Sequence, residues 1–176
     1  DPDIDCEKIS QDLSIDPVII QVLLNRGINT KTSIINFLNT TALYNSPLGM
    51  NGLNQACHIL IDNIVSGKKI RICSDYDVDG VCSGYILLKG LHVLWKKIGS
   101  EQPRLDIDIP HRVKDGYGLN TRMINQAHND HVDTIITCDN GISAYDAISL
   151  AKKYGMTVIV TDHHQVPYTE ISGTKE

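Results

Sequence analysis

Acidic and histidine side chains occur in this chain in short groups, and each group directly follows a short apolar run. The groups are Asp75–Asp79, Pro110–Arg112, Asp139 and Asp162–His164. Carboxylates gathered in one place repel each other unless cations lie between them, so one or two bound divalent ions would best explain such a cluster. Oxygen ligands mixed with imidazole favour Mn²⁺, with Mg²⁺ as the second choice.

This donor set points to hydrolysis. Two divalent ions about 3.5–4 Å apart can activate a water molecule and stabilise the leaving oxygen of a phosphoester. The pattern therefore predicts a metal-dependent phosphoesterase, provided that the fold brings the groups together.

The segments that would position these groups alternate between strand and helix from residue 68 onward. Strands are expected at 69–73, 105–109, 134–137 and 157–160, and helices at about 81–98, 117–128 and 143–154. This alternation predicts an α/β fold with a doubly wound, mainly parallel sheet and flanking helices. Ligands bind outside the carboxyl ends of the strands in such sheets, and all four groups lie at those ends.

The first 67 residues have a different, helical pattern. Capping residues followed by apolar periodicity predict short helices that begin at Asp16, at Thr30 or Thr32, and at Asn51 or Asn54. A turn-rich connection is expected between residues 39 and 49. The predicted organisation is a helical N-terminal region, 1–67, followed by an α/β domain, 68–176.

Composition limits the function classes. No apolar run reaches the ~18 residues that cross a bilayer, and the first residues lack the order of a secretory signal, so we expect a soluble cytoplasmic protein. The five cysteines are too widely spaced for a local redox pair or zinc knuckle, which predicts reduced thiols. A net charge of −5 argues against binding nucleic acid by bulk charge, so a nuclease would need metal ions or a local basic groove.

Two other metal or phosphate sites share part of the pattern. The stretch from Asp75 to Gly80 matches the start of an EF-hand loop, but the twelfth position is Ile86 instead of glutamate. It also resembles the Asp-x-Asp of haloacid-dehalogenase phosphatases, whose pattern does not require a later Asp-His-His. The isolated histidines are interpreted as packing or surface residues: His58, His92, His128 and His131.

Taken together, the groups resemble the DHH phosphoesterase superfamily, named for a triad present here as Asp162, His163 and His164. The resemblance implies that Asp162 orients the site and that His164 acts near the scissile phosphate as an acid or phosphate contact. It also implies that four residues are metal ligands: Asp77, Asp79, Asp139 and His163. Asp75 would be a further ligand or would support the ligands closely.

Narrower features resemble the RecJ-type exonucleases within that superfamily. The matching segments run in the same order from about residue 17 to 167 and include 23–28, 75–80, 109–112 and 116–119. The resemblance implies 5′-to-3′ hydrolysis of single-stranded DNA in repair and recombination. Single-stranded DNA, and other repair or replication proteins, are the implied partners, with no membrane.

One stretch near the acidic groups has residues suited to a nucleic-acid strand. Arg112 can form bidentate bonds to a phosphate, Tyr117 offers a stacking face, and Gly116 and Gly118 allow close approach of a backbone. We therefore expect these four residues to bind the substrate.

Two departures from the RecJ pattern matter. Cys82 stands where threonine is usual, and the chain lacks a fourth acidic motif and a second domain that the resemblance implies. We therefore expect an incomplete catalytic core that is weak or inactive by itself.

Two alternative functions stay open. One is a DHH phosphodiesterase acting on short RNA or cyclic dinucleotides. The other is a non-catalytic RecJ-like scaffold subunit of a replicative helicase. The scaffold is disfavoured because all the motif acids and both histidines are present.

Overall fold

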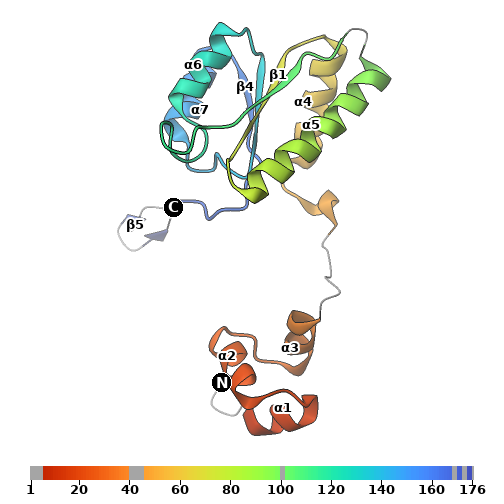
Figure 1. Cartoon of the computed structure of the whole chain (residues 1–176), viewed down its shortest axis with the longest axis vertical. Helices are drawn as coiled ribbons and strands as arrows, with labels where there is room; N and C mark the ends of the chain where they lie inside the picture. The colour runs from red at the N-terminus through yellow and green to blue at the C-terminus, as the bar shows by residue number, and fades with distance from the viewer. Residues whose placement is uncertain (1–5, 40–45, 100–101, 168–169, 172–173, 176) are drawn as a thin grey trace. The chain divides into compact units, whose positions relative to one another are not determined.

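The computed structural model describes residues 6–39, 46–99, 102–167, 170–171 and 174–175 (Figure 1). The chain divides into two compact units, Asp1–Asn51 and Gly52–Glu176. From the sequence we placed the division after residue 67. The difference concerns one helix, α4 (Leu53–Val65), whose Leu60 and Ile64 are buried in the same core as residues of the sheet.

The described part of the first unit contains three short α-helices: α1 (Cys6–Leu13), α2 (Pro17–Asn25) and α3 (Lys31–Leu38). The helix starts predicted at Asp16 and Thr30 are confirmed, since each side chain accepts a hydrogen bond from a backbone N–H of the first turn. Helix α1 was not predicted, because its apolar residues are few. The small core consists of Ile20, Leu23 and Ile34.

The start of α4 differs from the prediction. It follows the 3₁₀ turn η1 (Pro47–Gly49) and begins after Gly52, which has a φ of 74° and offers no side-chain cap. A left-handed glycine thus makes the turn that we assigned to a capping Asn51 or Asn54. The expected turn-rich connection before it lies largely outside the described residues.

The sheet confirms the predicted fold class. Its strands are β1 (Ile70–Ser74), β2 (Leu105–Asp108), β3 (Thr134–Cys138) and β4 (Thr157–Ile159), all parallel, in the order β2-β1-β3-β4. A separate antiparallel pair joins β5 (Glu170–Ile171) to β6 (Thr174–Lys175).

Helices cover both faces of the four-stranded sheet (Figure 1). Because side chains alternate along a strand, Ile70 and Ile72 pack with α4 and with Leu91 and Trp95 of α5 (Val78–Ile98), whereas Cys73 packs on the other face. That face is covered by α6 (Thr121–Asn129) and α7 (Tyr145–Lys153). Burial on both faces explains the continuous apolar runs of β1 and β3.

Helices α5 and α6 begin three and four residues away from the predicted positions, and both shifts occur beside the carboxyl ends of the strands. Helix α5 starts three residues early because Asp77 caps it, accepting a hydrogen bond from Gly80 N at 2.9 Å. Helix α6 starts at Thr121, after the Asn120 cap, because residues 117–120 form an irregular loop instead of a first turn.

In the described part of the chain, no helix has the length and apolarity to span a bilayer.

Candidate metal centre

The carboxyl ends of β1 and β3 lie side by side and carry the first two acids of the site. Backbone hydrogen bonds extend the sheet past its strands, from Asp75 N to Cys138 O at 3.2 Å and from Asp139 N to Thr161 O at 3.0 Å. Asp75 is fully buried and Asp139 nearly so. Three separate strands therefore deliver their acidic groups to one edge, as the sequence predicted.

Two carboxylate oxygens at this edge have no hydrogen-bond partner among the described residues, Oδ2 of Asp75 and Oδ1 of Asp139. The other oxygen of Asp75 accepts a weak bond from Gly118 N at 3.3 Å. Burial raises the pKa of Asp139, and the negative charge of Asp77 raises it further. Because unpaired buried carboxylates cost several kcal/mol in proteins, this arrangement suits a bound cation.

His163 lies against the unpartnered oxygen of Asp139. Its Nε2 is 2.8 Å from Asp139 Oδ1, within ion-pair distance, and this contact partly offsets the effect of burial on the pKa of Asp139. Its side chain is 70% exposed, so the ring is accessible from solvent. Ligand atoms of Asp139, His163 and His164 all lie within 4.8 Å of one another, which is compatible with one ion.

His164 differs from its neighbour because both of its ring nitrogens are engaged. Nδ1 lies 2.6 Å from Asp162 Oδ1, and Nε2 lies 3.1 Å from the Tyr117 hydroxyl. That hydroxyl donates to the backbone oxygen of Asp139 at 3.0 Å, so its oxygen can accept from His164. The bond to Asp162 raises the pKa of His164, which favours the charged ring with both nitrogens donating.

Asp162 and Tyr117 keep this arrangement fixed. Asp162 also accepts from the backbone N–H groups of Ile142 at 2.9 Å and His164 at 3.0 Å. Burial alone would raise the pKa of Asp162, but these bonds outweigh it and hold the pKa below its ordinary value. Burial, together with the charges of Asp75 and Asp139, raises the pKa of Tyr117 to about 12, so its hydroxyl stays protonated.

The start of α5 presses against the end of β1. A Cβ added to Gly80 would lie 2.5 Å from the backbone oxygen of Asp75, so only glycine fits there. This close approach brings Asp77 near enough to perturb Asp139. Asp79 lies in the first turn of α5, and none of the described contacts joins it to the other predicted ligands.

The other residues expected to bind substrate lie around Tyr117. Arg112 is connected to Tyr117 through Tyr76, a residue that the sequence analysis did not identify. The Arg112 guanidinium lies over the ring of Tyr76, 5.3 Å from its centre, and Tyr76 meets Tyr117 edge-on with ring centres 6.3 Å apart. Gly116 is exposed and has open space around it, whereas Gly118 is buried and donates to Asp75. The two glycines therefore have different surroundings.

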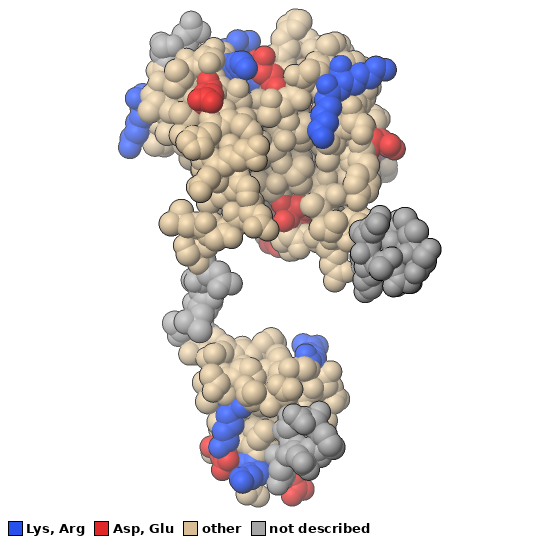
Figure 2. Space-filling view, turned by 180° about the vertical axis from the view of Figure 1, so that it is seen from behind, with Lys and Arg blue, Asp and Glu red and all other residues tan. Residues whose placement is uncertain are grey.

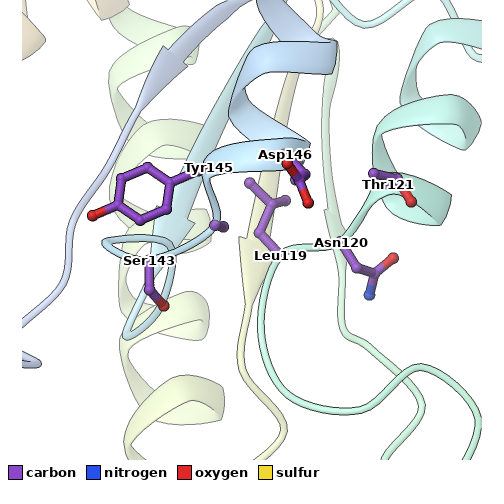
Figure 3. A pocket seen from close by; sticks show the side chains of 8 residues that line it. Leu119, Asn120, Thr121, Ser143, Tyr145 and Asp146 are labelled. Atoms are coloured by element: carbon purple, nitrogen blue, oxygen red, sulfur yellow. The ribbon is translucent and has the colours of Figure 1, made fainter. Parts of the chain in front are cut away.

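A groove of about 400 Å³ lies next to this edge, and no residue of it was predicted. Figure 3 shows it between the N-terminal ends of α6 and α7, with lining side chains that include Leu119, Asn120, Thr121, Ser143, Tyr145 and Asp146. Figure 2 shows acidic atoms at the lower edge of the sheet unit with no Lys or Arg side chain visible beside them, whereas acidic atoms near the top of the same face lie next to basic ones.

The sequence also failed to single out Asn140, which is 1% exposed and bonded to three backbone groups. Its position directly after Asp139 was the available signal. A polar residue between a candidate ligand and a glycine, at the end of a buried strand, has few ways to be satisfied except by backbone groups.

Comparison with known proteins agrees with this geometry. The family model described as "DHH family, N-terminal domain" matches residues 69–175. The single-stranded-DNA-specific exonuclease RecJ of Bacillus subtilis (strain 168) is 36% identical over 166 residues, which are 93% of this chain and 20% of that protein. The RecJ of Escherichia coli (strain K12) is 34% identical over 65% of this chain and 19% of its own length.

Solved structures show the same likeness. A crystal structure of exonuclease RecJ bound to manganese is 32% identical, with a TM-score of 0.61 over 74% of this chain and 32% of that chain. RecJ from Thermus thermophilus, in complex with Mn²⁺, shares the fold at 24% identity, with a TM-score of 0.56 over 96% of this chain and 22% of that one.

This chain spans about a fifth of the length of the RecJ proteins from B. subtilis and E. coli. The family model, however, matches more than half of the chain, including all four strands of the sheet and the whole candidate centre. The chain belongs to the DHH family.

Proposed function

We propose that this chain carries the catalytic centre of a metal-dependent exonuclease that hydrolyses single-stranded DNA from its 5′ end. The observation that supports the chemistry is the pair of unpartnered, buried carboxylate oxygens on Asp75 and Asp139, with the exposed imidazole of His163 beside one of them. The single-stranded DNA substrate is supported by the names of the RecJ relatives, and the 5′ direction rests on the resemblance alone.

Asp75, Asp139 and His163 would hold the metal, with Asp77 close by. Asp79 joins them on the resemblance alone. Divalent ions at this position would supply an activated water and charge compensation for the phosphoester oxygens. Mn²⁺ fits the mixed carboxylate and imidazole donors, with Mg²⁺ as the alternative. Manganese is also the ion named for the RecJ structures.

His164 has a separate role in this proposal. Its nitrogens are already engaged by Asp162 and Tyr117, so it is less available as a ligand than His163. A charged imidazole next to the metal ligands can contact a phosphate oxygen or give a proton to the leaving oxygen. Asp162 holds the ring in place and favours its charged form.

Arg112, Tyr76 and Tyr117 form a row beside the site that suits the substrate strand. The guanidinium can bind a phosphate while an exposed face of the tyrosine pair stacks on a base. Gly116 leaves room for a backbone to approach, whereas Gly118 contributes by holding Asp75. Other repair or replication proteins as partners, and a cytoplasmic location, are proposed on the same likeness.

The test is a cleavage assay with the full-length protein, Mn²⁺, and single strands labelled at the 5′ or the 3′ end. We expect mononucleotides to be released from the 5′ end and Asp139→Asn to lower the rate by more than about 100-fold. A preference for short RNA or cyclic dinucleotides, or an Asp139→Asn protein with the unchanged rate, would contradict the proposal.

Arg112→Ala tests the substrate row in the same protein. Losing a charged bond to phosphate should raise KM for single strands about 10-fold while kcat changes little. Arg104→Ala is the matched control, because Arg104 precedes β2 at the opposite edge of the sheet and its side chain donates to Gly67 O, far from the metal ligands. An equal KM in both variants would remove Arg112 from the substrate site.

A further inference from the structure

A buried asparagine lies at the point where three metal-site segments meet. Asn140 is 1% exposed, and both the amide nitrogen and the amide oxygen of its side chain make hydrogen bonds. Nδ2 donates to Cys73 O at 3.1 Å and to Cys138 O at 2.8 Å, and Oδ1 accepts from Leu119 N at 3.1 Å.

Each of these backbone groups lies within two residues of a residue of the candidate centre. Cys73 lies two residues before Asp75, and Cys138 directly precedes Asp139. Leu119 follows Gly118, whose N–H donates to Asp75 Oδ1. A single side chain thus connects the ends of β1 and β3 and the loop that carries Tyr117.

The backbone of Asp139 itself needs such support. Its φ of 63° is in the left-handed region, which costs a non-glycine residue of order 1 kcal/mol unless the surroundings hold it there. The bonds made by the next residue, Asn140, fix the chain directly after this turn. The unpartnered Oδ1 of Asp139 is consequently held near His163 instead of turning toward solvent.

We propose that Asn140 is a positioning residue for the metal centre. Asn140 sets the separation between Asp75 and Asp139 and holds both carboxylates in the arrangement that binds the ion. This inference rests on the proposed metal site. Neither aspartate nor alanine can replace these bonds: an ionised aspartate has no donor for the two carbonyl oxygens, and alanine leaves all three backbone groups without this partner in a buried place.

A purely structural asparagine is available for comparison. Asn63 of α4 is 5% exposed and donates to Thr134 Oγ1 at 2.8 Å, at the amino end of β3. It shares the residue type and the burial of Asn140, and it bonds to the opposite end of the same strand. Substitutions at Asn63 should therefore lower stability without changing the affinity for metal.

The test is to titrate Mn²⁺ into the chain and into four variants. Electron paramagnetic resonance monitors the binding, at a temperature where each protein is folded. Asn140→Ala and Asn140→Asp should bind Mn²⁺ about 10- to 100-fold more weakly, and Asn63→Ala and Asn63→Asp with unchanged affinity. Asn140→Asp is the sharper variant, because its added negative charge alone would tighten Mn²⁺ binding, whereas loss of positioning weakens it.

The outcomes separate this inference from the proposed function. Mn²⁺ binding by the unsubstituted chain and equal binding by both Asn140 variants would overturn only the positioning role. No binding by the unsubstituted chain would overturn both. If neither Asn140 variant folds, amide hydrogen exchange of the unsubstituted chain decides: Mn²⁺ should slow exchange at Leu119, and an unchanged rate there would overturn the inference.

Discussion

The two edges of the sheet hold acids in opposite ways. At the amino edge, Arg71 makes a bidentate bond to Asp106, at 2.6 and 2.8 Å, and a further bond of 2.8 Å to Asp130. Lys69 lies 3.1 Å from Asp106 as well. At the carboxyl edge, Asp75 and Asp139 each keep a buried oxygen without a hydrogen-bond partner among the described residues.

The pKa values respond in opposite directions. Burial alone would raise the pKa of Asp106, but bonds from Arg71 and Lys69 outweigh it, so the pKa is lowered. The bond from Arg71 also lowers the pKa of Asp130. Burial raises the pKa of Asp139, and the charge of Asp77 adds to the effect.

The contrast shows that this fold can neutralise its acids with side chains. At the carboxyl edge the compensation is incomplete: His163 lies 2.8 Å from one oxygen of Asp139, yet burial and the charge of Asp77 still leave the pKa of Asp139 raised. Acids left uncompensated at the strand ends of a parallel sheet are acids available to a ligand. The acids bonded to Arg71 therefore contribute to stability. Asp75 and Asp139 cost free energy of folding, and binding of a ligand explains why they are present.

The largest effect should come from Arg71→Met, which leaves Asp106 with Lys69 alone and Asp130 with the neutral Gln126. We expect a loss of about 2 kcal/mol in the free energy of unfolding, because both carboxylates are about one third exposed and partly screened. Urea denaturation at pH 7 measures it. Arg104→Met, which loses one exposed hydrogen bond, is the control and should cost less than about 0.5 kcal/mol.

The loss should depend on pH. The pKa values of Asp106 and Asp130 are lowered by folding, so their contribution is complete above the ordinary value of 3.8 and disappears as the pH falls through the lowered values. The difference between Arg71→Met and the unsubstituted chain should therefore shrink below pH 3.8. A constant difference would mean that Arg71 acts by packing alone.

Asp139→Asn should have a smaller effect of opposite sign. Because folding raises the pKa of Asp139, its charged form is disfavoured in the folded state at neutral pH, and the cost is relieved as the pH falls through the raised value. Removing the charge should stabilise the metal-free chain by about 1 kcal/mol at pH 7. Denaturation in the presence of a chelator tests this, and a loss of stability would show that the acid is already compensated.

The smallest effect concerns His164. Its pKa is raised first by the bond to Asp162, so Asp162→Asn should lower it. NMR titration of the imidazole signals in the metal-free chain would show the change. The raised pKa adds stability that is complete below 6.5 and is lost as the pH rises through the folded value. An unchanged titration would remove Asp162 as the residue that favours the charged ring.

Much of this comparison was predictable from the sequence. Apolar runs alternating with helical segments predicted the strands and their parallel arrangement. The convergence of Asp75, Asp139 and Asp162 followed, because the carboxyl ends of parallel strands meet at one edge of the sheet. Helix starts at Asp16 and Thr30 also followed from local capping chemistry.

What could not be predicted depends on contacts distant in sequence. Tyr76 joins Arg112 to Tyr117 across loops from two different strands, and Asn140 bonds to Cys73, 67 residues away. The local sequence can indicate that Asn140 bonds to backbone groups, but it does not identify these distant partners. The packing of α4 on the sheet was missed for the same reason, since its apolar residues gave no sign of their partner.

The central claim, that the uncompensated acids form a metal site, is tested most directly by calorimetric titration of Mn²⁺ into the chain and into Asp139→Ala. Asp139 supplies an unpartnered oxygen beside His163, so its loss should weaken Mn²⁺ binding by at least about 10-fold. Arg104→Met, at the other edge of the sheet, should bind as the unsubstituted chain does. Equal affinity of the unsubstituted chain and Asp139→Ala would contradict the account.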